Sequence, residues 1–180
     1  MCGIVGILNL SGAPTDINIL KKMTDKIIHR GPDGEGHWIE DYIAMGHRRL
    51  SIIDPTSAGH QPMISNDKRF IISYNGEVYN YIKLRDDLKK KGYRFNSNTD
   101  TEVVLNAFAE WGEESVKRFN GMFAFAIWDR FKKTLFLIRD RYGIKPLYYS
   151  EVGGMIIFGS EQKAILEPPI INTDLYNNYP

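Results

Sequence analysis

The chain opens with MCGIVG, residues 1–6, and this stretch contains its only cysteine. Removal of the initiator methionine would leave Cys2 as the N-terminal residue, with a thiol and a free α-amine on the same residue. Because an unperturbed thiol has a pKa of about 8.5 and an α-amine one of about 8, the amine can take the thiol proton near neutral pH. The stretch therefore predicts a nucleophile that carries its own base. A structural alternative is open at this point, in which Cys2 is only a small residue that opens a buried strand at residues 3–8.

Composition excludes several classes of function. The 180 residues are 43% hydrophobic, which suits one domain with a sizeable core. The 23 basic and 22 acidic residues are mixed along the chain and give a net charge of +1, so nothing favours nucleic acid or an anionic membrane as a partner. A lone cysteine excludes an internal disulfide and a cysteine-based zinc site. With no leader pattern and no long apolar span, we expect a cytoplasmic location.

Local patterns predict strands and helices along the whole chain. We expect strands at about 3–9, 37–39, 42–47, 70–74, 122–129, 134–139, 146–149 and 155–158, and helices at about 16–28, 79–91, 161–166 and from about 98–101 onward. The NGE stretch at 75–77 is interpreted as a turn between a strand and a helix. The strands at 122–129 and 134–139 are apolar on both faces, which indicates cover on two sides. Two stacked sheets with helices outside them fit this pattern.

Two further patterns are interpreted as structural. The glycines of GPDGEG at 31–36 do not follow a strand, so they are not a dinucleotide fingerprint. The histidines do not have the spacing of metal ligands, and we expect no metal site. These are His29, His37, His47 and His60.

Seven motifs then occur in order along the chain. They are MCGI at 1–4, HRGPD at 29–33, RLSIID at 49–54, YNGEVYN at 74–80, GMFAFA at 121–126, RDRYGIKPLYY at 139–149 and SEQKA at 160–164. Together they resemble the glutaminase domain of glutamine-hydrolysing asparagine synthetase, a class II glutamine amidotransferase. The resemblance implies an α+β fold, the four-layer αββα sandwich of N-terminal-nucleophile (Ntn) hydrolases, with two stacked, mainly antiparallel sheets. It covers residues 2–166, a glutamine amidotransferase type 2 domain.

The resemblance also implies roles for individual residues. Cys2 corresponds to the nucleophile that attacks the side-chain amide of glutamine, and its α-amine to the general base. Asn75 and the backbone N–H of Gly76 correspond to the oxyanion hole, which stabilises the charge that develops on the attacked carbonyl. Hydrolysis of the resulting thioester gives glutamate and ammonia, and this step needs no cofactor. HRGPD belongs to the resemblance too, but we assign no role to its Arg30 or Asp33.

Substrate-binding roles follow in the same way. Arg49 corresponds to the residue that holds the α-carboxylate of glutamine, which a guanidinium can grip through two parallel hydrogen bonds. Glu77 and Asp100 match acidic positions around the substrate, and Asp100 is the better candidate for the α-ammonium. Two of these residues also have a structural alternative. Arg49 could form a surface ion pair, and Asp100 could be a helix N-cap. The segment after Arg49 also lends backbone atoms to the site, at Leu50, Ile52 and Ile53.

The chain lacks one part of the full enzymes that it resembles. Their second domain carries an SGGxDS pyrophosphate loop, and no such motif occurs here. We therefore expect a glutaminase domain whose residues 167–180 are a linker towards an absent synthetase domain of the same full-length chain. ATP and Mg would act only in that domain, which would use the ammonia to make asparagine. Met1, if retained, would acylate the α-amine and leave the nucleophile inactive.

Other functions stay open on the sequence. One is the glutaminase domain of another class II amidotransferase, for amino-sugar or phosphoribosylamine synthesis. A second, from a different class, is a non-catalytic Ntn-fold domain that serves interaction or regulation. The sequence leaves the oligomeric state open, a homodimer included.

Overall fold

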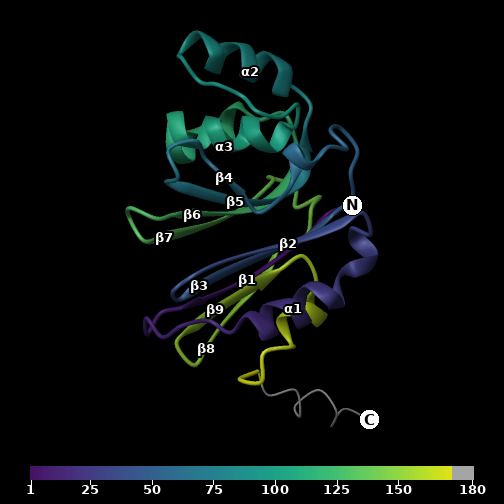
Figure 1. Ribbon diagram of the computed structural model, residues 1–180, viewed down its shortest axis with the longest axis vertical. Coiled ribbons are helices and arrows are strands. Elements are labelled where there is room, and N and C mark those ends of the chain that lie inside the picture. The colour runs from purple at the N-terminus through teal and green to yellow at the C-terminus, as the bar shows by residue number, and fades with distance from the viewer. Residues whose placement is uncertain (172–180) are drawn as a thin grey trace.

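Two antiparallel β-sheets are stacked face to face at the centre of the structure, and helices cover the outer face of each (Figure 1). This computed structural model describes residues 1–171. The four layers agree with the αββα sandwich that the resemblance implies, and the fold expectation is confirmed.

The elements have the following bounds. The first sheet contains β1 (Gly3–Asn9), β2 (Gly34–Glu40), β3 (Ile43–Arg49), β8 (Tyr148–Val152) and β9 (Met155–Gly159). The second contains β4 (Met63–Ile64), β5 (Phe70–Val78), β6 (Gly121–Asp129) and β7 (Thr134–Arg139). The helices are α1 (Ile17–Lys26), α2 (Tyr81–Lys90), α3 (Asp100–Trp111) and α4 (Gln162–Ile165). Short 3-10 segments lie at Ile28–Arg30, Ser57–Gly59 and Gly112–Arg118.

Strand order puts the N-terminus in the middle of its sheet. The five-stranded sheet runs β2-β3-β1-β9-β8 and the four-stranded sheet β4-β5-β6-β7. β1 is therefore paired on both sides, with β3 and with β9. Because Cys2 immediately precedes this central strand, its position is fixed by the most constrained part of the sheet.

Alternating side chains on the strands build three apolar layers. The layer between the sheets is formed by Leu8, Ile43, Met45, Ile71, Ala126, Trp128 and Phe158. The opposite face of β5 and β6 packs against α2 and α3, and the opposite face of β1 and β9 packs against α1 and α4. This alternation is the period of two expected for a strand that is covered on both faces.

The first two long helices begin and end near the expected residues. Asp16 caps α1 by accepting a hydrogen bond from the N–H of Asn18 at 2.8 Å. Leu20, Met23 and Ile27 are buried, as their spacing predicts. Gly92, with φ +95°, follows the end of α2, which is a conformation that favours glycine.

Two parts of the sequence interpretation are wrong. The NGE stretch is not a turn, because β5 continues through it to Val78 and pairs residue for residue with β6. Tertiary pairing overrides the local preference of Asn-Gly for a tight turn. The two-residue strand β4 also lies in a segment that the sequence suggested was loop. β7 does contact apolar layers on both faces, but its position at the sheet edge leaves it only half buried.

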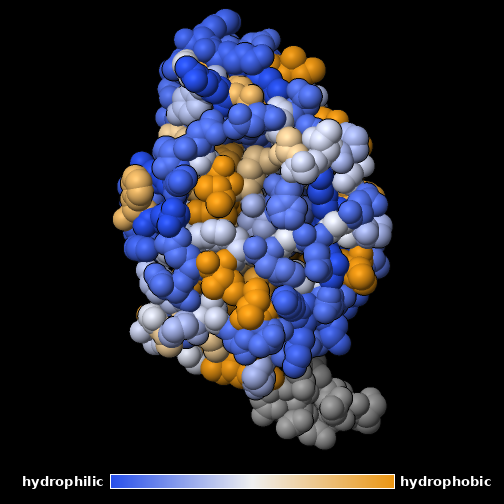
Figure 2. All heavy atoms as spheres, in the orientation of Figure 1, coloured by the Kyte–Doolittle hydropathy of each residue, from blue (hydrophilic) through white to orange (hydrophobic). Residues whose placement is uncertain are grey.

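The surface and the C-terminal segment complete the description. Figure 2 shows a mainly hydrophilic face on which hydrophobic residues form small separate patches. Among residues 1–171, no helix is long and apolar enough to cross a membrane. The start of the expected linker lies against the domain, where Glu167 pairs with Lys26 at 2.9 Å and Ile171 contacts the apolar layer under α1. Residues 172–180 lie outside the described residues.

Candidate active site

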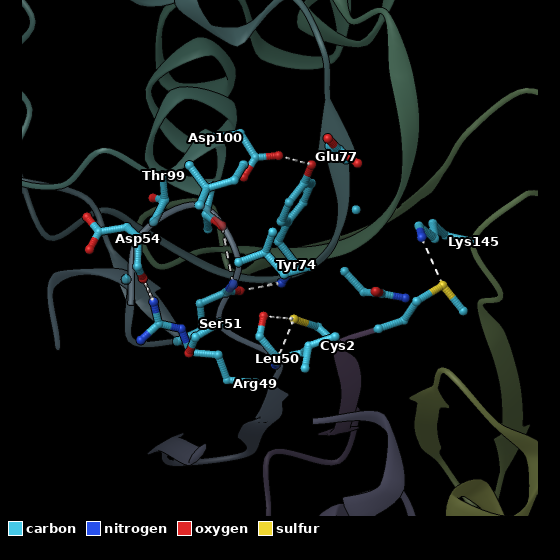
Figure 3. Close-up of a pocket in the computed structure, with 18 of the residues that line it drawn as sticks. Cys2, Arg49, Leu50, Ser51, Asp54, Tyr74, Glu77, Thr99, Asp100 and Lys145 are labelled. Carbon is cyan, nitrogen blue, oxygen red and sulfur yellow. Dashed lines mark hydrogen bonds between the residues drawn. The ribbon is translucent and has the colours of Figure 1, made fainter. Parts of the chain in front are cut away.

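A cavity of about 300 Å³ opens at the end of the sandwich where β1, β3 and β5 meet. Its walls come from both sheets, from the loop after β3 and from the start of α3 (Figure 3). All nine residues that the resemblance assigns to the site line this cavity: Cys2, Arg49, Leu50, Ile52, Ile53, Asn75, Gly76, Glu77 and Asp100. The fold thus brings together residues that lie up to 98 positions apart in the sequence.

The Cys2 thiol lies against the backbone of Leu50. The N–H of Leu50 donates to Sγ at 3.3 Å, and Sγ lies 3.6 Å from the Leu50 carbonyl oxygen. Burial raises the pKa of the Cys2 thiol, while the Leu50 N–H, the N-terminal charge and Arg49 act in the opposite direction. Because the raised pKa keeps the sulfur protonated at neutral pH, an attack by Cys2 requires a base beside it.

Met1 occupies the chain position that the proposed base would need. It lines the cavity, and its peptide bond converts the nitrogen of Cys2 into an amide. The Sδ atom of Met1 accepts a hydrogen bond from Nζ of Lys145 at 2.9 Å. Lys145 is buried, and this desolvation lowers the pKa of its ammonium, with Arg30 adding to the effect. An amine able to accept the thiol proton would exist only after Met1 is removed.

Arg30, to which the sequence gave no role, holds the backbone of the nucleophile. Its Nε donates to the carbonyl oxygen of Cys2 at 2.9 Å, and its Nη1 donates to Oε1 of Glu161 at 3.0 Å. Burial opposes ionisation of Glu161, but hydrogen bonds from Arg30, Lys163 and His29 outweigh it and lower its pKa from 4.5 to about 2. The HRGPD and SEQKA motifs therefore meet at one ion pair that fixes Cys2.

Asp33 of the same motif shapes the loop after β3. Its Oδ2 accepts a hydrogen bond from the N–H of Ser51 at 2.8 Å. Gly31 lies so close to the backbone of Arg48 that a Cβ there would overlap it. The HRGPD loop is therefore packed directly against the segment that carries Arg49 to Ile53. Sequence reasoning missed both roles because they depend on contacts between distant loops.

Asn75 and Gly76 lie near the end of β5, where it borders the cavity. Asn75 is 1% exposed, and within residues 1–171 its Nδ2 has no hydrogen-bond partner. Such a buried, unpaired donor is rare in proteins and points to a group that acts on a ligand. Gly76 has no room for a side chain, since a Cβ would lie 2.7 Å from the Met122 carbonyl oxygen. An amide N–H₂ and a backbone N–H are thus adjacent at the cavity wall.

Arg49 is anchored through the loop that follows it. Its Nη1 donates to the carbonyl of Thr56 at 2.8 Å, and its Nη2 donates to the carbonyl of Asp54. Both anchors are neutral backbone oxygens, and the surface ion pair that the sequence allowed is not found for Arg49 among residues 1–171. Gly59 lies directly against the guanidinium. The anchors use two of the five N–H donors of Arg49.

Asp100 is buried at the first residue of α3. The N-cap of this helix is Thr99, whose side chain accepts from the N–H of Glu102 at 3.2 Å, so the alternative that Asp100 is the cap is wrong. The Oδ2 atom of Asp100 accepts hydrogen bonds from the Tyr74 hydroxyl at 2.7 Å and from the Val78 N–H at 3.0 Å. Burial raises the pKa of the Asp100 carboxyl, and these hydrogen bonds offset part of the effect.

The remaining candidates lie at the rim. Glu77 is exposed at the end of β5, and Ile52 is 77% exposed in the loop after β3. Figure 3 shows Cys2 between Arg49 and Lys145, with Asp100 and Glu77 at a further wall. A substrate with both a carboxylate and an ammonium group would meet two cationic and three anionic side chains in this cavity: Arg49, Lys145, Asp54, Glu77 and Asp100.

Comparison with known proteins identifies a group of relatives. The family model for the glutamine amidotransferase domain matches residues 1–179. Asparagine synthetase [glutamine-hydrolyzing] 1 of Bacillus subtilis is 43% identical over 92% of this chain and 27% of its own length. Asparagine synthetase [glutamine-hydrolyzing] 3 of the same organism is 42% identical over 95% and 28%. The rice enzyme asparagine synthetase [glutamine-hydrolyzing] 2 is 39% identical over 92% and 28%. The chain spans little more than a quarter of the length of these relatives.

Solved structures show the same fold at low identity. Glutamine phosphoribosylpyrophosphate amidotransferase from Bacillus subtilis superposes with a TM-score of 0.76 at 21% identity, over 91% of this chain and 42% of that one. A second structure, described as the allosteric regulatory enzyme of purine biosynthesis, gives 0.76 at 22% identity over 92% and 43%. With the sequence relatives and the family model in agreement, the chain belongs to the glutamine amidotransferase domain family.

Proposed function

We propose that this domain hydrolyses the side-chain amide of glutamine to glutamate and ammonia, with Cys2 as the nucleophile. The observation that carries the proposal is Nδ2 of Asn75, which has no hydrogen-bond partner among the described residues and is buried in the wall of the cavity that holds the Cys2 thiol. A donor in this position is what the developing oxyanion of an attacked amide requires.

The reaction proceeds in two halves. Once Met1 is removed, the α-amine of Cys2 takes the thiol proton as sulfur attacks the amide carbon. Asn75 Nδ2 and the Gly76 N–H stabilise the oxyanion, and the α-ammonium returns its proton to the departing nitrogen, which leaves as ammonia. Water then attacks the γ-glutamyl thioester, and glutamate is released as the thiol is regenerated. The chain supplies nucleophile, base and oxyanion donors itself, so the proposed step uses no cofactor.

The amino-acid head of glutamine would be held by opposite charges. Arg49 would bind the α-carboxylate, and its anchors to the carbonyls of Asp54 and Thr56 fix its guanidinium for that contact. Asp100 would bind the α-ammonium, with Glu77 at the rim as a second anion. Backbone atoms of the loop after β3 would complete the pocket at Leu50, Ile52 and Ile53.

We also propose that the ammonia serves asparagine synthesis. Support comes from relatives of about 40% identity that are named as glutamine-hydrolysing asparagine synthetases. The proposed acceptor is aspartate, activated with ATP and Mg in a synthetase domain that corresponds to the remainder of those relatives. A chain that carries both parts should form asparagine from glutamine and aspartate, whereas formation of an amino sugar or phosphoribosylamine would contradict this assignment.

Two further expectations concern the setting of the reaction. A cysteine nucleophile must stay reduced, which favours the cytoplasm over an oxidising compartment. A homodimer is compatible with the sequence, and analytical ultracentrifugation of the purified domain measures the oligomeric state directly.

The deciding experiment combines mass and labelling. Intact mass first establishes whether Met1 has been removed, and the processed protein is then treated with 6-diazo-5-oxo-norleucine, a glutamine-like electrophile. A single adduct on Cys2, absent in Cys2→Ala and suppressed by glutamine, is the expected result. Glutamate release from glutamine is measured on the same samples. A processed chain that takes no label and releases no glutamate would refute the proposed function.

A further inference from the structure

Within residues 1–171, the edge of β5 that faces the cavity is not paired with another strand along its second half. β4 contains only two residues and pairs with β5 no further than Ile72. In an antiparallel strand, alternate residues direct both backbone polar groups to the same side. Tyr74, Gly76 and Val78 therefore share this unpaired edge, beside the candidate oxyanion hole.

Side chains take the place of the missing strand. The Tyr74 N–H donates to Oε1 of Gln61 at 2.7 Å, and the Tyr74 carbonyl oxygen accepts from Nε2 of His47 at 3.0 Å. Further along, the Val78 N–H donates to Asp100. Both backbone groups of Tyr74 are thus fixed, and the N–H of Gly76 lies between two residues whose positions are set by side chains.

His47 reaches this edge from the other sheet. It is fully buried on β3, in the layer between the sheets. A carbonyl oxygen only accepts, so Nε2 carries the proton, and burial lowers the pKa of the imidazole to about 3, which keeps the ring neutral. Next to it, the Ser73 hydroxyl donates to the Gly46 carbonyl at 3.0 Å. Two hydrogen bonds therefore join the sheets at the cavity end of the layer between them.

These contacts indicate a role for His47 and Gln61. We propose that His47 and Gln61 are positioning residues of the glutaminase reaction, which clamp the backbone of Tyr74 and so aim Asn75 and Gly76 at the oxyanion. The assignment rests on the proposed function. The clamped carbonyl belongs to the peptide unit that leads directly into Asn75, so a shift of Tyr74 moves both donors together. A displacement of about 1 Å in such a group lowers the rate by about 10²-fold.

Kinetics on the processed chain test the clamp. His47→Leu removes the donor and Gln61→Met removes the acceptor, and each should lower kcat by about 10²-fold with KM for glutamine largely unchanged. His47→Gln keeps an amide donor and should recover most of the rate. Because both residues act on Tyr74, the double variant should lose less than the product of the two single effects. The matched control is Met45→Ala, on the same strand and in the same layer, which should lower stability and leave kcat unchanged.

Amide hydrogen exchange gives a second readout that does not need activity. Exchange of the amides of Tyr74 and Asn75 should be faster in His47→Leu than in Met45→Ala, compared at temperatures equally far below each melting temperature. Wild-type kcat in a folded His47→Leu protein, or equal exchange in the two variants, would overturn the clamp. If the processed wild type is inactive but Tyr74 and Asn75 still exchange faster in His47→Leu than in Met45→Ala, the proposed function is overturned and the contact of His47 with the Tyr74 backbone is supported.

Discussion

Replacing Gly59 by alanine should weaken glutamine binding without changing the chemical step. Gly59 ends a 3-10 segment beside the site, and a Cβ built on it would overlap the guanidinium of Arg49, with Cζ at 2.9 Å. The Cβ cannot relax to the other side, because Thr99 Cγ2 lies 3.0 Å away. The guanidinium must therefore leave the position in which the carbonyls of Asp54 and Thr56 hold it.

The size of the effect follows from the contact that is lost. A hydrogen bond to a charged group contributes about 1.5–3 kcal/mol, and about 1.4 kcal/mol corresponds to a factor of ten in affinity. Loss of one of two guanidinium–carboxylate hydrogen bonds should therefore raise KM for glutamine by about 10- to 100-fold. Because the α-carboxylate is held equally in the ground state and the transition state, kcat should change little.

The assay is glutamate release as a function of glutamine concentration, on processed protein. Gly34→Ala is the matched control, since a Cβ at Gly34 also faces Arg49 but meets only its Cβ, at 3.9 Å. It should leave KM unchanged. A normal KM in Gly59→Ala, with both variants equally stable, would show that Arg49 does not hold the carboxylate or that its position is not critical.

Three further changes test other parts of the site. Asn75→Ala should lower kcat by about 10²–10³-fold without loss of thermal stability, because Nδ2 bonds nothing within residues 1–171; single-turnover kinetics and a melting curve check both. Asp100→Asn should raise KM, yet resist urea at pH 7 at least as well as the wild type. The raised pKa of Asp100 means that ionising it opposes folding above its ordinary value of 3.8, and a large loss of stability would contradict this. Glu161→Gln should destabilise the protein at pH 7. Urea titrations should show this difference shrinking as pH falls from 4.5 towards 2, since the pKa of Glu161 is depressed to about 2.

The fold class and the candidate residues could be predicted from the sequence, but the edge of β5 could not. Alternation in β6 indicated a strand covered on both faces, and the seven motifs indicated the sandwich. Asn75-Gly76 has a strong local preference for a tight turn, and only pairing with β6 from Phe70 to Val78 holds it in a strand. Such pairing joins residues far apart in the sequence, so no local pattern reports it.

Roles that depend on contacts between loops were also beyond local patterns. Arg30 and Glu161 are 131 positions apart, and the carbonyl that Arg30 holds belongs to a third segment. The sequence places Arg30 in a motif without indicating its function, and His47 is interpreted from it as one of four structural histidines. The available signal was a charged residue in a turn-rich loop for Arg30 and a polar residue in a buried strand for His47, and neither is specific to a site.

The position of Asn75 and Gly76 within a strand bears on how the site works. A turn at Asn75-Gly76 would place the proposed oxyanion donors on a mobile loop, whereas β5 holds them in a strand paired with β6 along its whole length. A strand interior usually has no free N–H to offer, because its neighbours on both sides use them. β4 is short, and its pairing with β5 extends no further than Ile72. The N–H of Gly76 therefore lies on an edge that borders the cavity. Rigidity comes from one neighbouring strand, and the free donor comes from the absence of the other.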